Sequence, residues 1–415
     1  MHILQITNHG LHEWQVTPGL PDTGGQNVYV NHLSAAFVRL GHEVTIVNRG
    51  GYTHPLTGEE RSGVVPGLDG RARIAYLADS TPSFVRKEDM EAQLPELALE
   101  LGELMRRQRF DLIISHYWDG ALLGVMANQS LPDPLPHYWI PHSLGALKRR
   151  NVDPSACVGL RIDERIAAEG RILAAVDGVA ATSVAIKASV AQDYGSSAEY
   201  FLPPGVDHER FRPRPAEECR PIWGFLAEKI GSDPALLRGR PLILEVSRTD
   251  TTKRKDVLLR AFAAVAQRDP KPLLAVTIDD INAELHASLI KLIEELGVGE
   301  QVAVLGSVWD ELPCLYSEAA IYCTPSIMEG FGMSAQEAAA ATVPVIASDR
   351  VPFAVEHLLG LETESRPIAG SAPISVGAGG IVVPADSIEG FASALELLLT
   401  DGDLREQMGR AAYHI

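Results

Sequence analysis

The sequence predicts an α/β protein made of two doubly wound, Rossmann-like domains, each a parallel sheet with helices on both faces. Short apolar runs alternate with amphipathic segments along the whole chain, which is the pattern of repeated βα units. The Pro-rich segment at residues 211–215 interrupts this pattern, which then restarts, and 415 residues suit two domains. We therefore expect an N-terminal domain over residues 1–213 and a C-terminal domain over residues 214–415, facing each other across a cleft.

Local patterns predict the individual elements. The stretches 28–40 and 88–107 are amphipathic, which predicts helices. Residues 360–380 carry Ser, Pro and Gly without periodicity, so we expect an irregular loop there. Strands are expected where short apolar runs occur, at residues 3–6, 44–47, 74–77, 112–115, 138–140 and 179–181 of the first domain, and at 241–246, 274–277, 302–305, 321–323, 343–347 and 381–383 of the second.

The bulk composition argues against several classes of partner. A net charge of −18 disfavours nucleic acid and anionic membranes as binding partners. The four cysteines show no metal-type spacing and indicate a reducing compartment without disulfides. The N-terminus has a strand pattern rather than that of a signal peptide, and no apolar run approaches the roughly 18 residues that span a bilayer. We therefore expect a cytoplasmic protein with no metal site.

Residues 325–337 hold two glutamates around a Gly-Phe-Gly turn. We expect Glu329 in the loop at the end of a buried strand, and Glu337 in the first turn of the next helix. Ligands of open α/β sheets bind outside the carboxyl ends of strands, and a helix N-terminus there offers N–H groups to an anion. Glu337 is compatible with ligand binding and also with a capping box that starts at Ser334.

A basic segment follows the first strand of the second domain. Arg248 and Lys253 can converge on a diphosphate there, with a guanidinium fork and a point charge in different roles. The segment is also compatible with a solvated basic loop. Cations at residues 253–255 lie near a helix N-terminus, where the macrodipole disfavours them, and this local conflict favours a functional role.

The first domain has two candidate sites at strand ends. Residues 22–26, Asp-Thr-Gly-Gly-Gln, form a Gly-rich turn that suits an anion or a sugar, whereas dinucleotide and P-loop signatures are absent from the sequence. His142 follows another strand and is compatible with a functional or a structural role. The basic run 148–150 either binds phosphate or is a solvated face. Residues that can join it are Arg86, Lys87 and Arg165.

Taken in order, these motifs resemble the retaining glycosyltransferases of family 4, which have the GT-B fold. The resemblance rests on Arg248 and Lys253 followed by Glu-x7-Glu at positions 329 and 337, together with residues 22–26, 142–145 and 203–207. It covers nearly the whole chain. Within the family, Asp-Thr-Gly-Gly-Gln and His-Ser-Leu-Gly-x-x-Lys look most like sucrose-phosphate synthases, which are enzymes of sucrose biosynthesis.

The resemblance implies a role for each matching residue of the donor site. Arg248 and Lys253 would hold the nucleotide diphosphate, and Glu329 would bind the transferred sugar. Glu337 would bind the ribose hydroxyls. The backbone lining the sugar would be that of Phe331, Gly332 and Met333.

The resemblance also assigns residues of the first domain. His142 would contact the donor sugar near the reacting carbon. Gly24 and Gly25 would approach the diphosphate, and Gln26 would face the acceptor. The phosphate of fructose 6-phosphate would be bound by Lys148 and Arg165 with Arg86 or Lys87.

The function implied is transfer of glucose, with retention, from UDP-glucose or ADP-glucose to fructose 6-phosphate, giving sucrose 6-phosphate without a required cofactor. Fixed cations and a helix N-terminus would stabilise the departing diphosphate. A diphosphate oxygen would take the acceptor proton, so Glu329 need not be a nucleophile as in retaining glycosidases. The alternatives are a related hexosyltransferase such as a mannosylfructose-phosphate synthase or sucrose synthase, a GT-B epimerase, or a nucleotide-sugar-binding protein.

Overall fold

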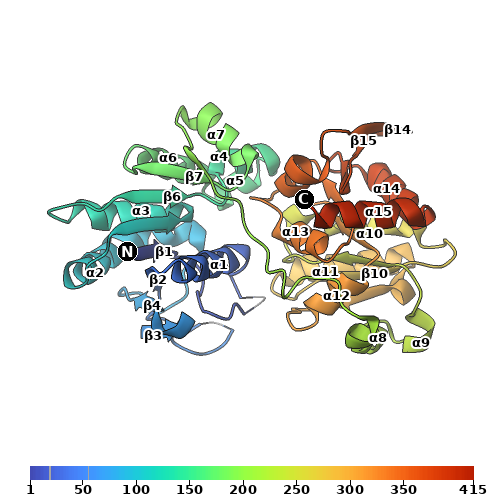
Figure 1. The fold of residues 1–415 in the computed structure, drawn as a ribbon, viewed down its shortest axis with the longest axis horizontal. Coiled ribbons are helices and arrows are strands. Elements are labelled where there is room, and N and C mark those ends of the chain that lie inside the picture. Colours follow the sequence, from blue (N-terminus) through green and yellow to red (C-terminus); the bar gives the residue numbers. More distant parts are fainter. Residues whose placement is uncertain (18–19, 55) are drawn as a thin grey trace. The chain divides into compact units, whose positions relative to one another are not determined.

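The computed structural model describes residues 1–17, 20–54 and 56–415. These residues form two compact units, Met1–Gly205 and Val206–Ile415 (Figure 1). The division therefore lies before the Pro-rich segment rather than after Pro213. The reason is that Phe211 is buried in the core of the second unit, edge-on to Tyr316 with ring centroids 5.5 Å apart.

The first unit contains an eight-stranded sheet in the order β3-β4-β2-β1-β5-β6-β7-β8. Strand β3 runs antiparallel to β4, and the other neighbours pair in parallel. From β1 the chain adds strands first on one side and then, from β5, on the other. The strands are β1 (His2–Ile6), β2 (Glu43–Arg49), β3 (Gly63–Gly67), β4 (Ala72–Leu77), β5 (Leu112–His116), β6 (His137–Ile140), β7 (Gly178–Ala181) and β8 (Tyr200–Phe201).

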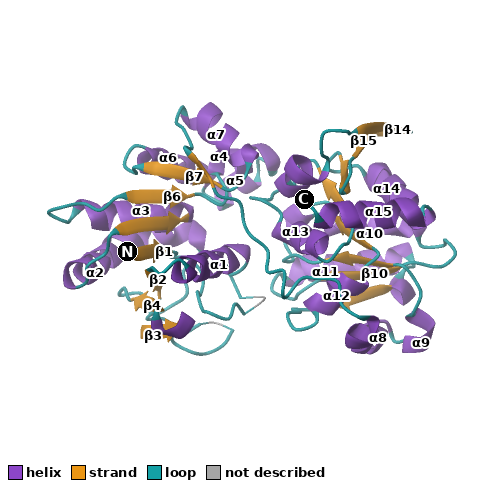
Figure 2. Ribbon diagram, in the orientation of Figure 1, coloured by secondary structure: helices purple, strands orange, loops and turns teal. Residues whose placement is uncertain are grey.

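Helices cover both faces of this sheet, as the βα pattern predicts (Figure 2). Leu4 and Ile6 of β1 pack into one apolar cluster and Ile3 packs into another, so alternate residues of a single strand are buried on opposite faces. The helices are α1 (Gly25–Arg39), α2 (Leu94–Arg107), α3 (Tyr117–Gln129), α4 (Gly145–Asn151), α5 (Ala156–Gly159), α6 (Ile162–Leu173) and α7 (Val184–Tyr194), with short 3-10 helices at Leu68–Gly70 and Lys87–Gln93.

One predicted helix is shorter than expected. The segment 88–107 is divided into the 3-10 turn Lys87–Gln93 and helix α2, which begins at Leu94. Pro95 lies in the first turn of α2, where its missing N–H costs no intrahelical hydrogen bond.

The second unit also contains an eight-stranded sheet, in the order β11-β10-β9-β12-β13-β16-β15-β14. Strands β11 to β16 along this order pair in parallel, and β15 and β14 add antiparallel strands at the edge. The strands are β9 (Leu242–Glu245), β10 (Leu273–Thr277), β11 (Val302–Leu305), β12 (Ile321–Thr324), β13 (Val345–Ser348), β14 (Glu364–Ile368), β15 (Ser371–Val376) and β16 (Gly380–Val383).

The predicted irregular loop over residues 360–380 is wrong. Strands β14 and β15 form an antiparallel hairpin there, with Gly370 in the turn at a φ of 77°. In β14 most side chains are exposed, and in β15 Ile374 and Val376 are buried. Edge strands of this kind bury little surface, so they carry a weak apolar alternation.

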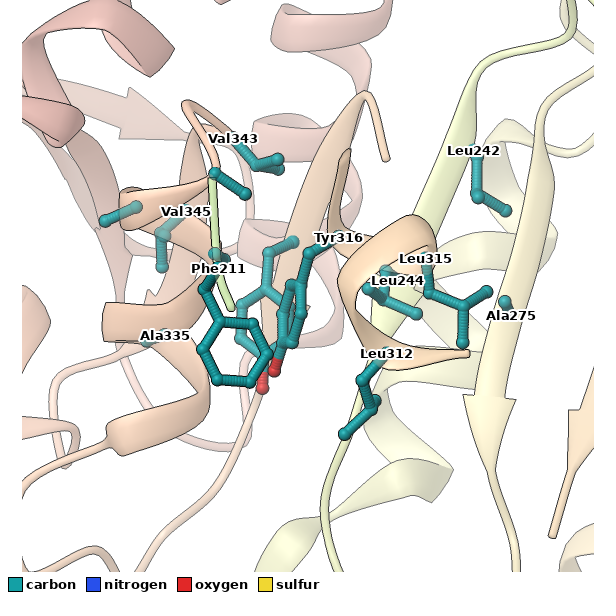
Figure 3. Packing of buried hydrophobic residues seen from close by; sticks show 14 of the residues in the cluster. Phe211, Leu242, Leu244, Ala275, Leu312, Leu315, Tyr316, Ala335, Val343 and Val345 are labelled. Carbon is teal, nitrogen blue, oxygen red and sulfur yellow. The ribbon is translucent and has the colours of Figure 1, made fainter. Parts of the chain in front are cut away.

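The helices of the second unit pack their apolar faces onto this sheet. Figure 3 shows Leu312, Leu315 and Tyr316 of α12 against Leu244 of β9 in one of the buried clusters. The helices are α8 (Ala216–Ile230), α9 (Pro234–Leu237), α10 (Lys255–Val265), α11 (Ala283–Leu296), α12 (Leu312–Glu318), α13 (Met333–Ala340), α14 (Ile388–Thr400) and α15 (Gly402–Tyr413), with 3-10 helices at Thr251–Lys253 and Gly299–Gln301 and a π-helix at Ala354–Leu358.

In the described ranges 1–17, 20–54 and 56–415, no helix combines the length and apolar character needed to cross a membrane.

The core of the second unit offers a direct stability test. Leu395 of α14 is fully buried, whereas Leu361 is fully exposed. We expect Leu395→Ala to lower the free energy of unfolding of this unit by about 2–5 kcal/mol, because it leaves a cavity. The matched change Leu361→Ala should cost less than about 0.5 kcal/mol. Urea unfolding of both variants checks this, and equal midpoints would contradict the burial of α14.

Candidate active site

The second unit brings Lys253 and Glu329 together. Strands β9 and β12 are neighbours where the strand order reverses, and the loops after their carboxyl ends carry these two residues. The Lys253 Nζ donates a hydrogen bond of 2.6 Å to Oε1 of Glu329. The two side chains are 10% and 22% exposed, so the pair is partly shielded yet reachable by a ligand. A crevice at such a reversal is where open α/β sheets bind ligands.

Hydrogen bonds connect the loop after β9 to the loop after β12. The Thr252 carbonyl accepts from the backbone N–H of Ile327 at 2.8 Å and from the Ser326 hydroxyl at 3.3 Å. The Asp250 carboxylate accepts from the Thr252 N–H at 2.9 Å and so caps the 3-10 turn that presents Lys253. The position of Lys253 relative to Glu329 is therefore set by the backbone as well as by their ion pair.

Arg248 lies on the same loop, but its side chain is 56% exposed. Its guanidinium lies 3.8 Å from the Asp250 carboxylate. Burial disfavours the charged form of Asp250, yet Lys253 and Arg248 together hold the pKa of Asp250 below its ordinary value. Both predicted phosphate-binding cations therefore act on one carboxylate, and Arg248 is the more accessible of the two.

The basic run 253–255 is not a solvated loop. Lys253 pairs with Glu329, while Arg254 pairs with Asp256 at 3.1 Å and with Asp386. Lys255 is buried and belongs to a separate ion pair below the loop. Each cation thus has its own acidic partner.

Of the two interpretations of Glu337, the capping box that starts at Ser334 does not form. Helix α13 begins at Met333, and its N-cap is Gly332, which has a φ of 107°. A Cβ atom at Gly332 would lie 2.6 Å from Cγ1 of Val351, so backbone conformation and packing both require glycine. Phe331 is buried, and its carbonyl accepts from the Phe353 N–H at 2.8 Å. A glycine N-cap has no side chain to cap the first N–H groups, which suits a site for an anion.

Glu337 lies one turn into α13 and is directed at α12 rather than at its own N-cap. The Tyr316 hydroxyl donates to Oε2 of Glu337 at 2.9 Å. Burial raises the pKa of Glu337 to about 7, although Tyr316 and Arg210 oppose this shift. The carboxyl can therefore change its protonation state near neutral pH.

The first unit places histidines at its own strand reversal, where β1 and β5 are neighbours. His142, after β6, lies with Nε2 2.9 Å from Nδ1 of His116, the last residue of β5. His116 Nε2 lies 3.0 Å from Oε1 of Gln5. His142 has a φ of 56°, and left-handed backbone in a residue other than glycine costs free energy and occurs often at functional sites.

Both of these histidines are neutral at physiological pH. Burial and the nearby His9 lower the pKa of His142 to about 3, and burial places the pKa of His116 well below its ordinary value. A neutral imidazole has one N–H donor and one acceptor nitrogen, so His142 suits hydrogen bonding to a hydroxyl group.

Sequence patterns did not single out His9 and Asp119. The His9 Nδ1 lies 2.9 Å from Oδ1 of Asp119, and both residues are buried. His9 follows β1, and Asp119 lies just after the end of β5. Both residues could have been identified from the sequence, because each closely follows the end of a predicted strand.

The Gly-rich turn has open space around it. Gly24 is the N-cap of α1, and its N–H donates to Oδ1 of Asn27 at 2.9 Å. A Cβ atom at Gly24 would meet no described atom within 4 Å, so packing does not require glycine there. Gly25 is the exposed first residue of α1, and Gln26 donates to the Thr7 hydroxyl at 3.0 Å.

A small pocket of the first unit, called the basic pocket here, is lined by Lys87, Lys148 and Arg165. Arg165 donates to Glu169 at 2.8 Å and to the Tyr117 hydroxyl at 2.6 Å, which fixes its guanidinium. The pocket is lined by Lys87, Tyr117, Trp118, Lys148, Leu160, Arg161 and Arg165, together with Glu88, Glu91 and Glu164.

The two basic residues of the loop after β4, Arg86 and Lys87, differ in position. Lys87 pairs with Asp22. Burial alone would raise the pKa of Asp22, but Lys87 holds that pKa below its ordinary value. Arg86 points elsewhere: it is exposed and pairs with Asp89 at 3.0 Å. Of the two alternatives for the loop after β4, the structure favours Lys87 as the pocket cation.

Within the part of the chain that the structure describes, no group of three or more His, Cys, Asp or Glu side chains is arranged to hold a metal ion.

Two family models match the chain, one for each unit. Residues 23–210 match the model described as Glycosyltransferase Family 4, and residues 228–415 match the model described as Glycosyl transferases group 1. A D-inositol 3-phosphate glycosyltransferase of Nocardia farcinica is 30% identical over 411 residues, which are 96% of this chain and 82% of that protein. A mannosylfructose-phosphate synthase of Agrobacterium fabrum is 28% identical over 364 residues, 83% of this chain and 75% of that protein.

Solved structures share the fold. The sucrose-phosphate synthase of Thermosynechococcus elongatus superposes with a TM-score of 0.82 at 23% identity, covering 100% of this chain and 93% of that one. The Anabaena protein HepE, in complex with UDP and glucose, superposes with a TM-score of 0.69 at 16% identity, covering 100% and 94%. With two Rossmann-like units of the GT-B type, the chain belongs to the family 4 glycosyltransferases and is a hexosyltransferase.

Proposed function

We propose that the protein transfers glucose from UDP-glucose to fructose 6-phosphate and releases sucrose 6-phosphate. The observation that carries the proposal is the basic pocket, in which Lys87, Lys148 and Arg165 can bind the acceptor's phosphate. The names of the three relatives above all include a phosphorylated sugar or polyol, which supports a phosphorylated acceptor.

On the donor side, Lys253 and the N-terminus of α13 would face the diphosphate, and the accessible Arg248 would fold onto it. The Lys253 charge and the N–H groups of α13 are fixed before the reaction, so they would stabilise the negative charge that develops on the leaving group. UDP as the nucleotide is supported by the complex of the Anabaena structural neighbour.

Glu329 would accept hydrogen bonds from the transferred sugar while Lys253 bridges it to the diphosphate. A carboxylate that is already engaged by a lysine at 2.6 Å is a weakened nucleophile. We therefore assign it to sugar binding. The acceptor hydroxyl would attack from the face that the diphosphate leaves, which retains the configuration, and a diphosphate oxygen would take its proton. Neutral His142 would hydrogen-bond a sugar hydroxyl, and Glu337 would accept from the ribose.

On the acceptor side, Gln26 would face the sugar ring and Gly24 and Gly25 would leave room for the diphosphate. The open space around Gly24 supports this assignment, since a glycine that packing does not require is often kept for close approach of a ligand.

A second candidate acceptor is an inositol phosphate. It is favoured by the Nocardia farcinica relative, which is named for D-inositol 3-phosphate and matches 96% of this chain. The basic pocket suits either phosphate, because its cations recognise the phosphate group and not the ring that carries it.

Product analysis separates these candidates. The protein is incubated with UDP-glucose, ADP-glucose or GDP-mannose, each with fructose 6-phosphate, fructose or inositol 3-phosphate, and products are identified by mass and anomeric NMR. The proposal expects an α-glucosyl product from UDP-glucose and fructose 6-phosphate. Turnover of inositol 3-phosphate alone would contradict the choice of acceptor, and a β-glucosyl product would contradict retention.

The basic pocket is tested by a neighbouring pair of substitutions. Lys148 lines the pocket, whereas Arg149 is exposed and lies 3.2 Å from Asp163. We expect Lys148→Ala to raise the KM for the phosphorylated acceptor by about tenfold or more, because a charge-assisted contact is lost. Its effect on a neutral acceptor should be small. Arg149→Ala should leave both KM values unchanged, and equal effects of the two variants would place the phosphate elsewhere.

Glu337 predicts a pH dependence of nucleotide binding. Its pKa of about 7 means that the carboxylate, the stronger acceptor for ribose hydroxyls, is lost as the pH falls from 8 to 6. We expect UDP affinity, measured by calorimetry, to weaken over this range more steeply than in Glu337→Gln. Tyr316→Phe removes a hydrogen bond that lowers the pKa, so the transition should move to higher pH. Identical pH profiles for the wild type and Glu337→Gln would exclude this role.

A further inference from the structure

A buried ion pair lies directly below the loop that carries Arg248 and Lys253. Glu245 is the last residue of β9, and Lys255 is the first residue of α10. The Lys255 Nζ donates to Oε2 of Glu245 at 2.8 Å, and both side chains are almost fully buried. The nine residues between them, 246–254, therefore start and end at one fixed contact.

Both members of the ion pair form hydrogen bonds with Ser247, which immediately precedes Arg248. The Lys255 Nζ donates to the Ser247 carbonyl at 3.1 Å, and the Ser247 hydroxyl donates to Oε1 of Glu245. The Thr277 hydroxyl, at the end of β10, donates to the same carbonyl at 2.6 Å and accepts from the Ser247 N–H at 2.9 Å. Every polar group of Ser247 thus has a partner in this network.

The same network reaches the first residue of α10 and the adjacent strand. The Lys255 Nζ also donates to the Thr277 hydroxyl at 3.0 Å and to the Thr277 carbonyl. One ammonium group therefore ties β9, β10 and α10 together at the carboxyl edge of the sheet. Lys253, two residues before Lys255, projects from the fixed end of this loop.

Stability alone does not account for the pair. A cation in the first helical turn opposes the macrodipole, and a buried ion pair is often no more stabilising than apolar residues of similar volume. The pair lies at the strand reversal and joins the two ends of the loop that carries Arg248 and Lys253. This position suggests a role in holding that loop rather than in stability alone. The Glu245 and Lys255 charges compensate each other, so they add no net charge beneath the diphosphate.

We infer that Glu245 and Lys255 are positioning residues for nucleotide binding, which fix the loop so that Arg248 and Lys253 reach the diphosphate together. This inference rests on the proposed donor site in the second unit. Neither residue touches the ligand in this account: both act through Ser247 and the backbone of the loop.

The test compares three variants by calorimetric titration with UDP. Lys255→Met should weaken UDP binding by about tenfold or more, because small misplacement of binding groups is costly. The double variant Glu245→Leu/Lys255→Met removes both buried charges, so its unfolding midpoint should recover towards that of the wild type while UDP binding stays weak. The matched control is Arg49→Met, which breaks a buried ion pair with Asp79 at 2.6 Å in the first unit and should leave UDP affinity unchanged.

The outcomes are distinct. UDP binding that recovers with stability in the double variant, or that is unaffected in Lys255→Met, would overturn the positioning role and leave the donor site intact. Failure of the wild type to bind UDP, ADP or GDP would overturn the donor site and this inference together. If Lys255→Met does not fold, the double variant alone decides, through its UDP affinity.

Discussion

The contact between Lys253 and Glu329 depends on strand order. The two residues lie 76 positions apart in the sequence and 2.6 Å apart in space, because β9 and β12 become neighbours where the order of the sheet reverses. Open α/β sheets bind ligands outside the carboxyl ends of their strands at such a reversal, so the loops there can carry polar groups. The apolar clusters on both faces of the sheet hold the strands in place, and the polar side chains of the candidate site lie at their carboxyl edge.

In the two units, different kinds of side chain gather at the same reversal of strand order. In the second unit the edge carries cations, carboxylates and an uncapped helix N-terminus at Gly332, which together suit a sugar diphosphate. In the first unit the edge carries the neutral histidines His116 and His142, and the basic pocket lies nearby in the same unit. A fold that repeats one topology can thus assign different ligands to its two halves through the loops alone.

Sequence patterns predicted the buried central strands of both sheets and the alternation of strands and helices, because these segments have strong apolar periodicities. They missed β3, β8, β14 and β15 at or next to the sheet edges. These patterns did not predict features that depend on tertiary packing. Val351 requires glycine at position 332, which moves the N-cap away from Ser334 and turns Glu337 towards Tyr316. Lys255 looked like part of a solvated run, but Glu245 draws it into the interior. Contacts such as these join residues that are distant in sequence, so local patterns do not reveal them.

We propose that Glu329 serves the transferred sugar and not the nucleotide. Glu329→Gln keeps the shape of the side chain and removes its charge, so initial rates and UDP titration can be compared in one variant. We expect a fall in kcat of about 100-fold or more, with a Kd for UDP within about threefold of the wild-type value. The exposed control Glu362→Gln should change neither. Parallel losses of kcat and UDP affinity in Glu329→Gln, or an unchanged kcat, would contradict it.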